Sequence, residues 1–155
     1  MRIQITDNKG KYHRNYNKEL AMRKAVSLPK LKKKALDLYS ELVKLRAYRD
    51  SKMYCYTCDS PLVLNTSNCQ LGHYLSRGAY QGLTFDPDNS RLQCYRCNCH
   101  LHGNLIEFRE RLINEIGISE VENMESRRHE TIKWSRSNYL EMIEDYKGQI
   151  NYLKT

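Results

Sequence analysis

The chain contains the sequence CYTC at residues 55–58 and the sequence CYRC at residues 94–97, and these two stretches decide the fold. Two cysteines with two residues between them bind one metal ion from a single tight turn, and a second such pair completes a tetrahedral site. We therefore predict a structural Zn²⁺ site of four thiolates. Its ligands would be Cys55, Cys58, Cys94 and Cys97.

The other two cysteines, Cys69 and Cys99, lie close to these pairs in sequence without sharing their spacing. The two-residue spacing favours Cys97 over Cys99 as the partner of Cys94, although Cys99 is an alternative ligand. For both remaining thiols we predict burial beside the metal site.

The 35 residues between the two pairs are more than a zinc ribbon needs, and they include the polar side chains that a phosphodiesterase would use. We expect short strands near residues 62–64 and 70–75, and the run Asp86-Pro87-Asp88-Asn89 predicts a turn before the second pair. In a strand, loop, strand and helix arrangement, a histidine that ends the first strand faces the start of the helix across the scissile phosphate. His73 and residues 98–102 fit these two positions.

Helical periodicity is found before this segment. From Pro29, apolar residues recur at steps of three and four, with lysines on the opposite face. The apolar stripe consists of Leu31, Ala35, Leu38, Leu42 and Leu45. Such a stripe packs either on its own domain or on a second copy of the chain, and the sequence leaves both arrangements open.

Three helices are expected after the second cysteine pair. The first has an apolar face and ends at Gly117; the second begins with a capping box of Ser119 and Glu122; the third begins near Ser135 or Ser137, with Trp134 anchoring its start. The residues expected to be buried are Leu105, Phe108, Leu112 and Ile116 in the first, Val121 and Met124 in the second, and Leu140, Ile143, Ile150 and Leu153 in the third.

The formal charge of +8 is concentrated near the start of the chain. Residues 1–50 contain 14 Lys/Arg and 5 Asp/Glu, whereas residues 51–155 contain 12 and 13. Residues 1–28 show no sustained apolar period and are expected to form a basic arm. A cationic segment of this kind favours a polyanionic partner such as nucleic acid, and a solvated surface is the alternative interpretation.

The cysteines are expected to be reduced. The first residues show no apolar signal segment, which argues against a secreted disulfide protein and favours a cytoplasmic one. No apolar run approaches the roughly 20 residues that cross a bilayer, and the mean hydropathy is −0.77. We therefore expect a soluble protein with no membrane partner.

An ordered series of motifs between residues 53 and 153 resembles the phage lambda NinG family, also called Rap, whose members are recombination endonucleases related to the His-Asn-His nucleases. The series is Gly72-His73-Tyr74, Asp88-Asn89, Gln93-Cys94-x-x-Cys97-Asn98, Gly103-Asn104-Leu105, Arg109, Leu112-Ile113, Ile116-Gly117 and Trp134. The resemblance covers about two thirds of the chain, and several motifs in order are more specific than any single one. The first 50 residues share only a basic, helical character.

The resemblance implies an α+β fold. Its centre would be a small zinc-stabilised core of the ββα-metal type, as in His-Asn-His and treble-clef proteins, flanked by N- and C-terminal helices. Residues 1–50 would form the basic arm and first helix, residues 51–117 the nuclease core, and residues 118–155 a C-terminal helical segment.

The resemblance also implies roles for three residues. His73 would be the general base that takes a proton from the attacking water, Asn89 would fix the loop and the orientation of the histidine, and Asn98 would face the metal or the phosphate. A catalytic Mg²⁺ or Mn²⁺ would stabilise charge on the phosphate and on the departing 3′ oxygen. The implied activity is a metal-dependent endonuclease that cleaves branched DNA such as Holliday junctions and D-loops. It would act in the host cytoplasm, as a homodimer because resolving a junction takes two cuts.

The chain departs from the wider nuclease pattern at two positions. Gly72 replaces the acidic or histidine ligand that often precedes the catalytic histidine, and Asn98 replaces the usual second histidine. These departures leave the catalytic ion short of ligands, and His102 or His100 is a candidate for one.

Cationic side chains close to the site are candidates for phosphate contacts, although each is equally well explained as surface charge. The candidates are Arg77, Arg91 and Arg96, with Lys32, Lys33 and Lys34 on the first helix. Tyr74 and Tyr80 would either stack on bases or pack against the zinc site.

A second hypothesis from another functional class is a non-catalytic zinc-knuckle adaptor that binds nucleic acid or a recombination partner. The residues that separate the two hypotheses are His73, Asn89 and Asn98, because a binding module has no need for an imidazole and two carboxamides beside its metal site.

Overall fold

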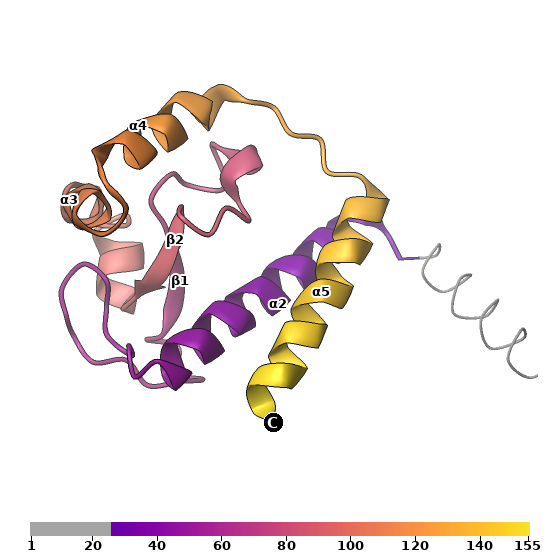
Figure 1. Cartoon of the computed structure of the whole chain (residues 1–155), viewed down its shortest axis with the longest axis horizontal. Coiled ribbons are helices and arrows are strands. Elements are labelled where there is room, and N and C mark those ends of the chain that lie inside the picture. Colours follow the sequence, from indigo (N-terminus) through magenta and orange to yellow (C-terminus); the bar gives the residue numbers. More distant parts are fainter. Residues whose placement is uncertain (1–25) are drawn as a thin grey trace, which may run out of the picture.

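The computed structural model describes residues 26–155 and shows a mixed α+β fold in which helices lie on both sides of one small hairpin (Figure 1). The helices are α2 (Leu28–Arg49), α3 (Leu105–Ile116), α4 (Ile118–Ser126) and α5 (Arg136–Lys154), and the strands are β1 (Gln70–His73) and β2 (Ser90–Gln93). Three single turns complete the fold: η1 (Gln81–Leu83), η2 (Arg96–His100) and η3 (Arg127–His129).

The hairpin is antiparallel, with Gln70 opposite Gln93 and His73 opposite Ser90. The strand predicted at residues 70–75 is therefore confirmed over its first four residues. The strand predicted at 62–64 is wrong: Pro61 forms only an isolated bridge with Tyr54, and the chain turns at Leu64 and Asn65.

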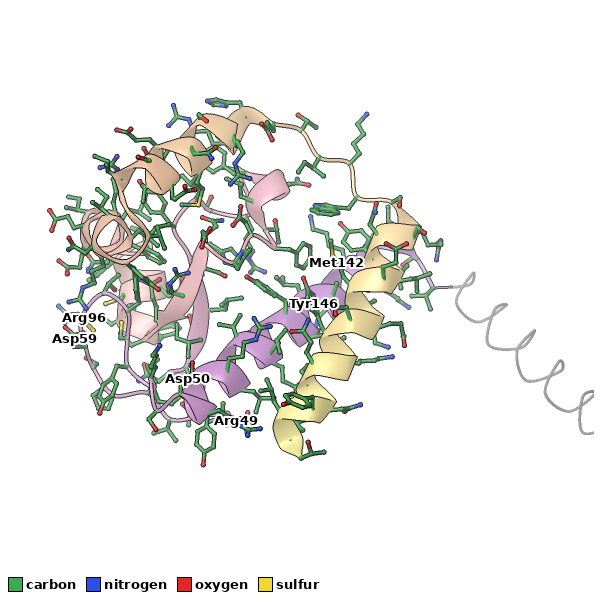
Figure 2. The ribbon with its side chains drawn as sticks, in the orientation of Figure 1. Arg49, Asp50, Asp59, Arg96, Met142 and Tyr146 are labelled. Atoms are coloured by element: carbon green, nitrogen blue, oxygen red, sulfur yellow. The ribbon has the colours of Figure 1, made fainter. Side chains whose placement is uncertain are left out.

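Helices α2 and α5 lie side by side and run in the same direction (Figure 1). Their N-terminal ends are joined by a hydrogen bond from Arg136 to the carbonyl of Val26, and their C-terminal ends by one from Arg49 to the carbonyl of Leu153. Figure 2 shows Met142 and Tyr146 on the side of α5 that faces α2. The predicted stripe of α2 thus packs within the chain.

The stripe differs in detail from the prediction. Leu31, Ala35 and Leu42 are buried, whereas Leu38 is only partly so. Tyr39 joins the buried face because its hydroxyl hydrogen-bonds to Ser90 Oγ at 2.6 Å, which ties α2 to the hairpin.

Helix α3 follows the prediction in ending at Gly117, whose φ of +89° favours glycine. Phe108 and Leu112 are fully buried, but Leu105 is 47% exposed and the prediction for it is wrong. The first turn of α3 lies beyond the edge of the core.

The predicted capping box at Ser119 is also wrong, because α4 begins at Ile118, immediately after Gly117, and the N–H of Val121 bonds to the carbonyl of Gly117. Val121 and Met124 are buried as predicted.

Helix α5 begins where the sequence predicts. Ser135 is its N-cap and forms a capping box with Asn138. Trp134 packs edge-on against Phe85 at a ring distance of 5.9 Å, which fixes the start of the helix to the loop between the two strands.

Candidate metal centre and hairpin site

The four predicted zinc ligands converge. The ligand atoms of Cys55, Cys58, Cys94 and Cys97 all lie within 4.8 Å of one another. Sγ of Cys58 and Sγ of Cys94 are 3.8 Å apart, which is about the edge of a tetrahedron with Zn–S bonds of roughly 2.3 Å. The donor set and its spacing therefore fit a structural Zn²⁺ ion.

Local backbone structure aims these thiols inward. Cys55 and Cys58 lie in a turn closed by the hydrogen bond from the N–H of Asp59 to the carbonyl of Cys55. Cys94 directly follows β2, and its sulfur accepts a hydrogen bond of 3.4 Å from the N–H of Cys97 in η2. The turn at residues 55–58, which we call the knuckle turn, and the end of the hairpin are thus joined at the four sulfur atoms.

The thiols differ in acidity. Burial raises the pKa of Cys58, but hydrogen bonds with Ser60, Cys55 and Cys97 outweigh it and bring the pKa to about 6. Burial, together with the neighbouring Cys58 and Cys94, raises the pKa of Cys97 to about 12. A bound dication supplies the positive charge that four adjacent thiolates need.

The remaining two cysteines have different surroundings. Cys69 is buried in the apolar cluster that contains Cys55, Leu62 and Leu92, as predicted. Cys99 is exposed, and the prediction of burial for it is wrong because η2 turns its side chain toward Gln70 at the surface. Cys97, and not Cys99, belongs to the metal cluster.

Asn89 is fully buried. It lies directly before β2, at the end of the loop that joins the two strands, and its hydrogen bonds close this loop. Its Oδ1 accepts from the N–H of Leu75 at 2.7 Å, and its Nδ2 donates to the carbonyls of Leu75 and Leu83, both at 2.9 Å. The carbonyl of Asn89 accepts from the N–H of Tyr74, the residue after His73. Asn89 therefore fixes the position of the backbone immediately after His73.

We predict that Asn89→Ala destabilises the fold. The change leaves the N–H and the carbonyl of Leu75 buried without partners, whereas the carbonyl of Leu83 keeps the N–H of Asp86 at 3.3 Å. Each unpaired group costs about 1–3 kcal/mol. Chemical denaturation should show a loss of roughly 2–4 kcal/mol, whereas Asn114→Ala on the exposed side of α3 should change stability little. Equal stability of the two variants would contradict the bonding role of Asn89.

His73 ends β1 with its ring half-buried. Its Nε2 lies 3.0 Å from the carbonyl oxygen of Thr84. A carbonyl can only accept, so Nε2 carries the hydrogen and Nδ1 is the basic nitrogen of the neutral ring. Burial lowers the pKa of His73 below its usual range, opposed by the Thr84 bond and assisted by the positive charge of Arg77. The ring is therefore neutral and basic near pH 7.

A cavity of about 390 Å³ brings His73 and Asn98 together. We call it the His73 cavity. Its wall also includes Arg77 from the loop after β1 and Asp37, Ser40 and Lys44 from α2. Asn98 donates to Gln70 Oε1 at 2.7 Å, which orients its amide. Asn89 is not among the lining residues and lies behind the cavity wall.

Asp37, Ser40 and Lys44 were missed in the sequence. They are spaced at three and four residues, so they form a polar strip beside the apolar stripe of α2. That spacing was a signal that one side of the helix borders a polar site.

A metal-binding side chain at Gly72 would force the side chain of Gln93 to move. A Cβ at Gly72 would lie 2.0 Å from Gln93 Oε1, and the Gln93 amide is fixed by hydrogen bonds to Thr57 Oγ1 and to the carbonyl of Gly103. An acidic or histidine side chain at position 72 would therefore require this buried amide to leave its hydrogen bonds.

The predicted phosphate-binding cations are placed unequally. Arg77 is exposed at the His73 cavity, and Arg96 is exposed at the metal-centre end of the molecule, away from α5 (Figure 2). Arg91 is engaged within the fold: it pairs with Glu115 at 3.0 Å, donates to the carbonyl of Pro87 at 2.7 Å and lies over the ring of Tyr56.

The lysines of α2 lie at the surface. Lys33 pairs with Asp37 at 2.6 Å, Lys34 is exposed, and Lys32 Nζ is 3.5 Å from Gln81 Oε1. His102 is exposed, with a positive φ, and does not line the His73 cavity. His100 is also exposed and packs against Tyr95.

Tyr74 packs inside the fold and does not face solvent. It is 8% exposed, contacts the ring of Phe108 and donates to Glu125 Oε1 at 2.5 Å. Tyr74 is therefore a core residue, but it packs in the cluster of Phe108 and not in the cluster that contains the zinc-site cysteines. Tyr80 is only partly buried and borders a second cavity described below.

The family model described as "Bacteriophage Lambda NinG protein" matches residues 3–155. The chain belongs to the NinG family. Among curated relatives it is 32% identical to Protein ninG of Salmonella phage P22 over 106 residues, which is 68% of this chain and 50% of that protein. It is 30% identical to Protein ninG of Escherichia phage lambda over 106 residues, with the same coverage. Protein ninG of Enterobacteria phage H19B is 38% identical over 78 residues, or 50% of this chain and 38% of that protein.

This NinG-family chain spans about half the length of several of the curated relatives it matches. No solved structure shows a significant match to it. Within residues 26–155, no NinG helix has both the length and the apolar character that a membrane span requires.

Proposed function

We propose that this NinG-family chain is a metal-dependent endonuclease of branched DNA, built on a hairpin and zinc site of the ββα-metal type. The observation that supports it best is the setting of His73. One ring nitrogen is held by a backbone carbonyl and the other is left as a base, at a cavity that also contains an amide and two cations. A protein that only binds has no need for this arrangement.

The chemistry follows from the tautomer. Nδ1 of His73 accepts a proton from a water molecule as the water oxygen attacks phosphorus, and the bond to the 3′ oxygen breaks. Arg77 and Lys44, which line the same cavity, stabilise the negative charge of the phosphate. Zn²⁺ at the four cysteines holds the hairpin and η2 together and takes no part in the reaction.

Asp37 and Asn98 are the oxygen donors that would hold a divalent ion in the His73 cavity. Carboxylate and amide oxygens suit Mg²⁺ and Mn²⁺. Because Gly72 is blocked by Gln93, a carboxylate from α2 replaces the one that the hairpin lacks. Such an ion would stabilise charge on the phosphate and on the departing oxygen.

The direct test compares a four-way junction, a flap and a linear duplex of equal length, each with Mg²⁺, with Mn²⁺ or with chelator. We expect metal-dependent cleavage of the branched substrates, which gel electrophoresis would measure. Tight binding of the junction without any cleavage would instead favour the adaptor hypothesis. Cutting in pairs at a junction would support action as a homodimer.

We also predict that Asp37→Asn weakens Mn²⁺ binding by about tenfold, since the change removes one anionic ligand. The free Mn²⁺ signal in electron paramagnetic resonance measures this without any reaction. Glu41→Gln is the matched control, because Glu41 lies one turn further along α2 and pairs with Lys154 at 2.8 Å. An equal effect of both changes would point to general surface charge and not to a site.

A further inference from the structure

A second cavity, of about 870 Å³, lies between the first turn of α2, η1 and the segment that follows α4. We call it the Tyr80 pocket. Its lining includes Leu28 and Lys32 of α2, Tyr80 beside η1, and Arg128, Ile132 and Trp134 of residues 127–134. Its volume is within the range of about 300–1,000 Å³ that is usual for ligand sites. No role in the reaction proposed above uses it.

The pocket is held open by close packing at its base. Residues 130–132 cross so near to η1 that a Cβ at Gly82 would lie 3.1 Å from the carbonyl oxygen of Glu130. The contact between Trp134 and Phe85 anchors the other end of this segment. Figure 1 shows the segment arching from the end of α4 to the start of α5. These contacts hold the segment against η1 and Phe85, and a wall formed before a ligand binds lowers the entropic cost of binding.

The chemistry of the wall combines flat and apolar side chains with cations. Leu28 and Ile132 are each 42% exposed, and the rings of Tyr80 and Trp134 lie beside them. A ligand that fits such a wall has flat rings.

The charge of the lining residues further restricts the class of ligand that fits. Lys32, Arg128 and Lys133 line the pocket, and Glu130 is the single acidic residue that does so. A wall that combines cations with apolar side chains suits a phosphate chain that bears flat bases, as in single-stranded DNA.

The Tyr80 pocket adjoins the His73 cavity. Lys32 lines the pocket and Leu36, one helical turn further along α2, lines the His73 cavity. Arg77 of the cavity and Ala79 of the pocket lie two residues apart in the loop after β1. A strand that leaves a duplex at His73 therefore meets the pocket next.

We propose that the Tyr80 pocket binds unpaired nucleotides of a single-stranded DNA segment next to the cleavage point. This inference rests on the proposed nuclease function, to which it adds a preference for substrates with an unpaired strand. The chain's own first 25 residues contain seven Lys/Arg and two Asp/Glu, so like charge disfavours them as the occupant.

The test uses Trp134, which is the only tryptophan in the chain and lines the pocket. An oligothymidylate of eight nucleotides is added to the full chain without divalent metal. It should quench Trp134 fluorescence, because a base stacks on or near the indole. A duplex of equal length and an octamer of glutamate should leave it unchanged. Absence of quenching by the oligothymidylate, or equal quenching by the glutamate peptide, would overturn the proposal.

Two paired substitutions locate the binding. Ile132→Ala with Lys133→Ala removes one apolar and one cationic group from the pocket wall, and should weaken oligothymidylate binding about tenfold in fluorescence anisotropy. Tyr152→Ala with Lys147→Ala changes the far part of α5, where Tyr152 is 77% exposed, and should have no effect. Equal losses in both would overturn the proposal.

The two proposals fail in different ways. If the chain cleaves branched DNA but the pocket variant binds oligothymidylate normally, the nuclease proposal stands and the pocket proposal fails. If oligothymidylate quenches Trp134 and no substrate is cleaved, the pocket binds single-stranded DNA, but the nuclease proposal fails and with it the placing of the pocket next to a cleavage point.

Discussion

Replacing His73 with alanine should reduce the cleavage of branched DNA by about 10²- to 10⁴-fold, which is the range that a general base contributes. The physical reason is the loss of Nδ1, the basic atom that the bond from Nε2 to Thr84 leaves available. Binding to a junction and zinc content should stay close to normal, because His73 is not one of the residues that form the metal cluster. Single-turnover cleavage, gel shift and metal analysis measure the three quantities.

His102→Ala is the matched control for that experiment. His102 is exposed and does not line the His73 cavity, so its removal should leave cleavage unchanged. If His73→Ala cleaves as well as the unaltered chain, His73 has no part in the reaction. If His102→Ala loses cleavage instead, the base or the ion lies in the loop after η2.

The same base sets the expected pH dependence. A general base must be neutral, so kcat/KM falls as the pH drops through the pKa of His73 and is flat above it. Since burial lowers that pKa below its usual range, the midpoint of the acid limb should lie below about 6.5. A midpoint above that value would assign the base to another group.

Local spacing made part of the site predictable. Two-residue gaps between cysteines, Gly117 after an apolar helix and Ser135 before another are signals that are complete within a few residues of sequence. The structure places all three as expected. The C-terminal end of α3, the start of α5 and the metal cluster were therefore predictable from the sequence alone.

Features that depend on distant parts of the chain were not predictable. The contribution of Asp37 to the His73 cavity requires α2 to lie over the hairpin, and that position depends on the bond between Tyr39 and Ser90, 51 residues apart. Likewise, the sequence gives no sign that Arg91 is engaged by Glu115 in α3. The burial predicted for Cys99 was wrong for a related reason. Whether a side chain in η2 is exposed depends on the direction in which that turn runs from the metal site.

Cys94→Ser should remove the metal and much of the stability of the fold. Cys94 is 5% exposed and joins the end of β2 to η2, so its loss releases the hairpin from the knuckle turn at once. Structural zinc sites supply folding free energy directly, about 10–16 kcal/mol in small zinc peptides. In a chain that also has apolar clusters, we expect a smaller loss of several kcal/mol, seen as a drop of about 10 °C or more in the midpoint of thermal unfolding.

Cys99→Ser provides the control, because Cys99 is exposed and outside the cluster of ligand atoms. That variant should keep one zinc per chain and an unchanged unfolding midpoint. Chelator should lower the midpoint of the unaltered chain and of Cys99→Ser, but should change that of Cys94→Ser little, since the metal is already lost. Retention of a full equivalent of zinc by Cys94→Ser would mean that another thiol takes its place. Cys69, which is buried in the same apolar cluster as Cys94, would then be the residue to replace next.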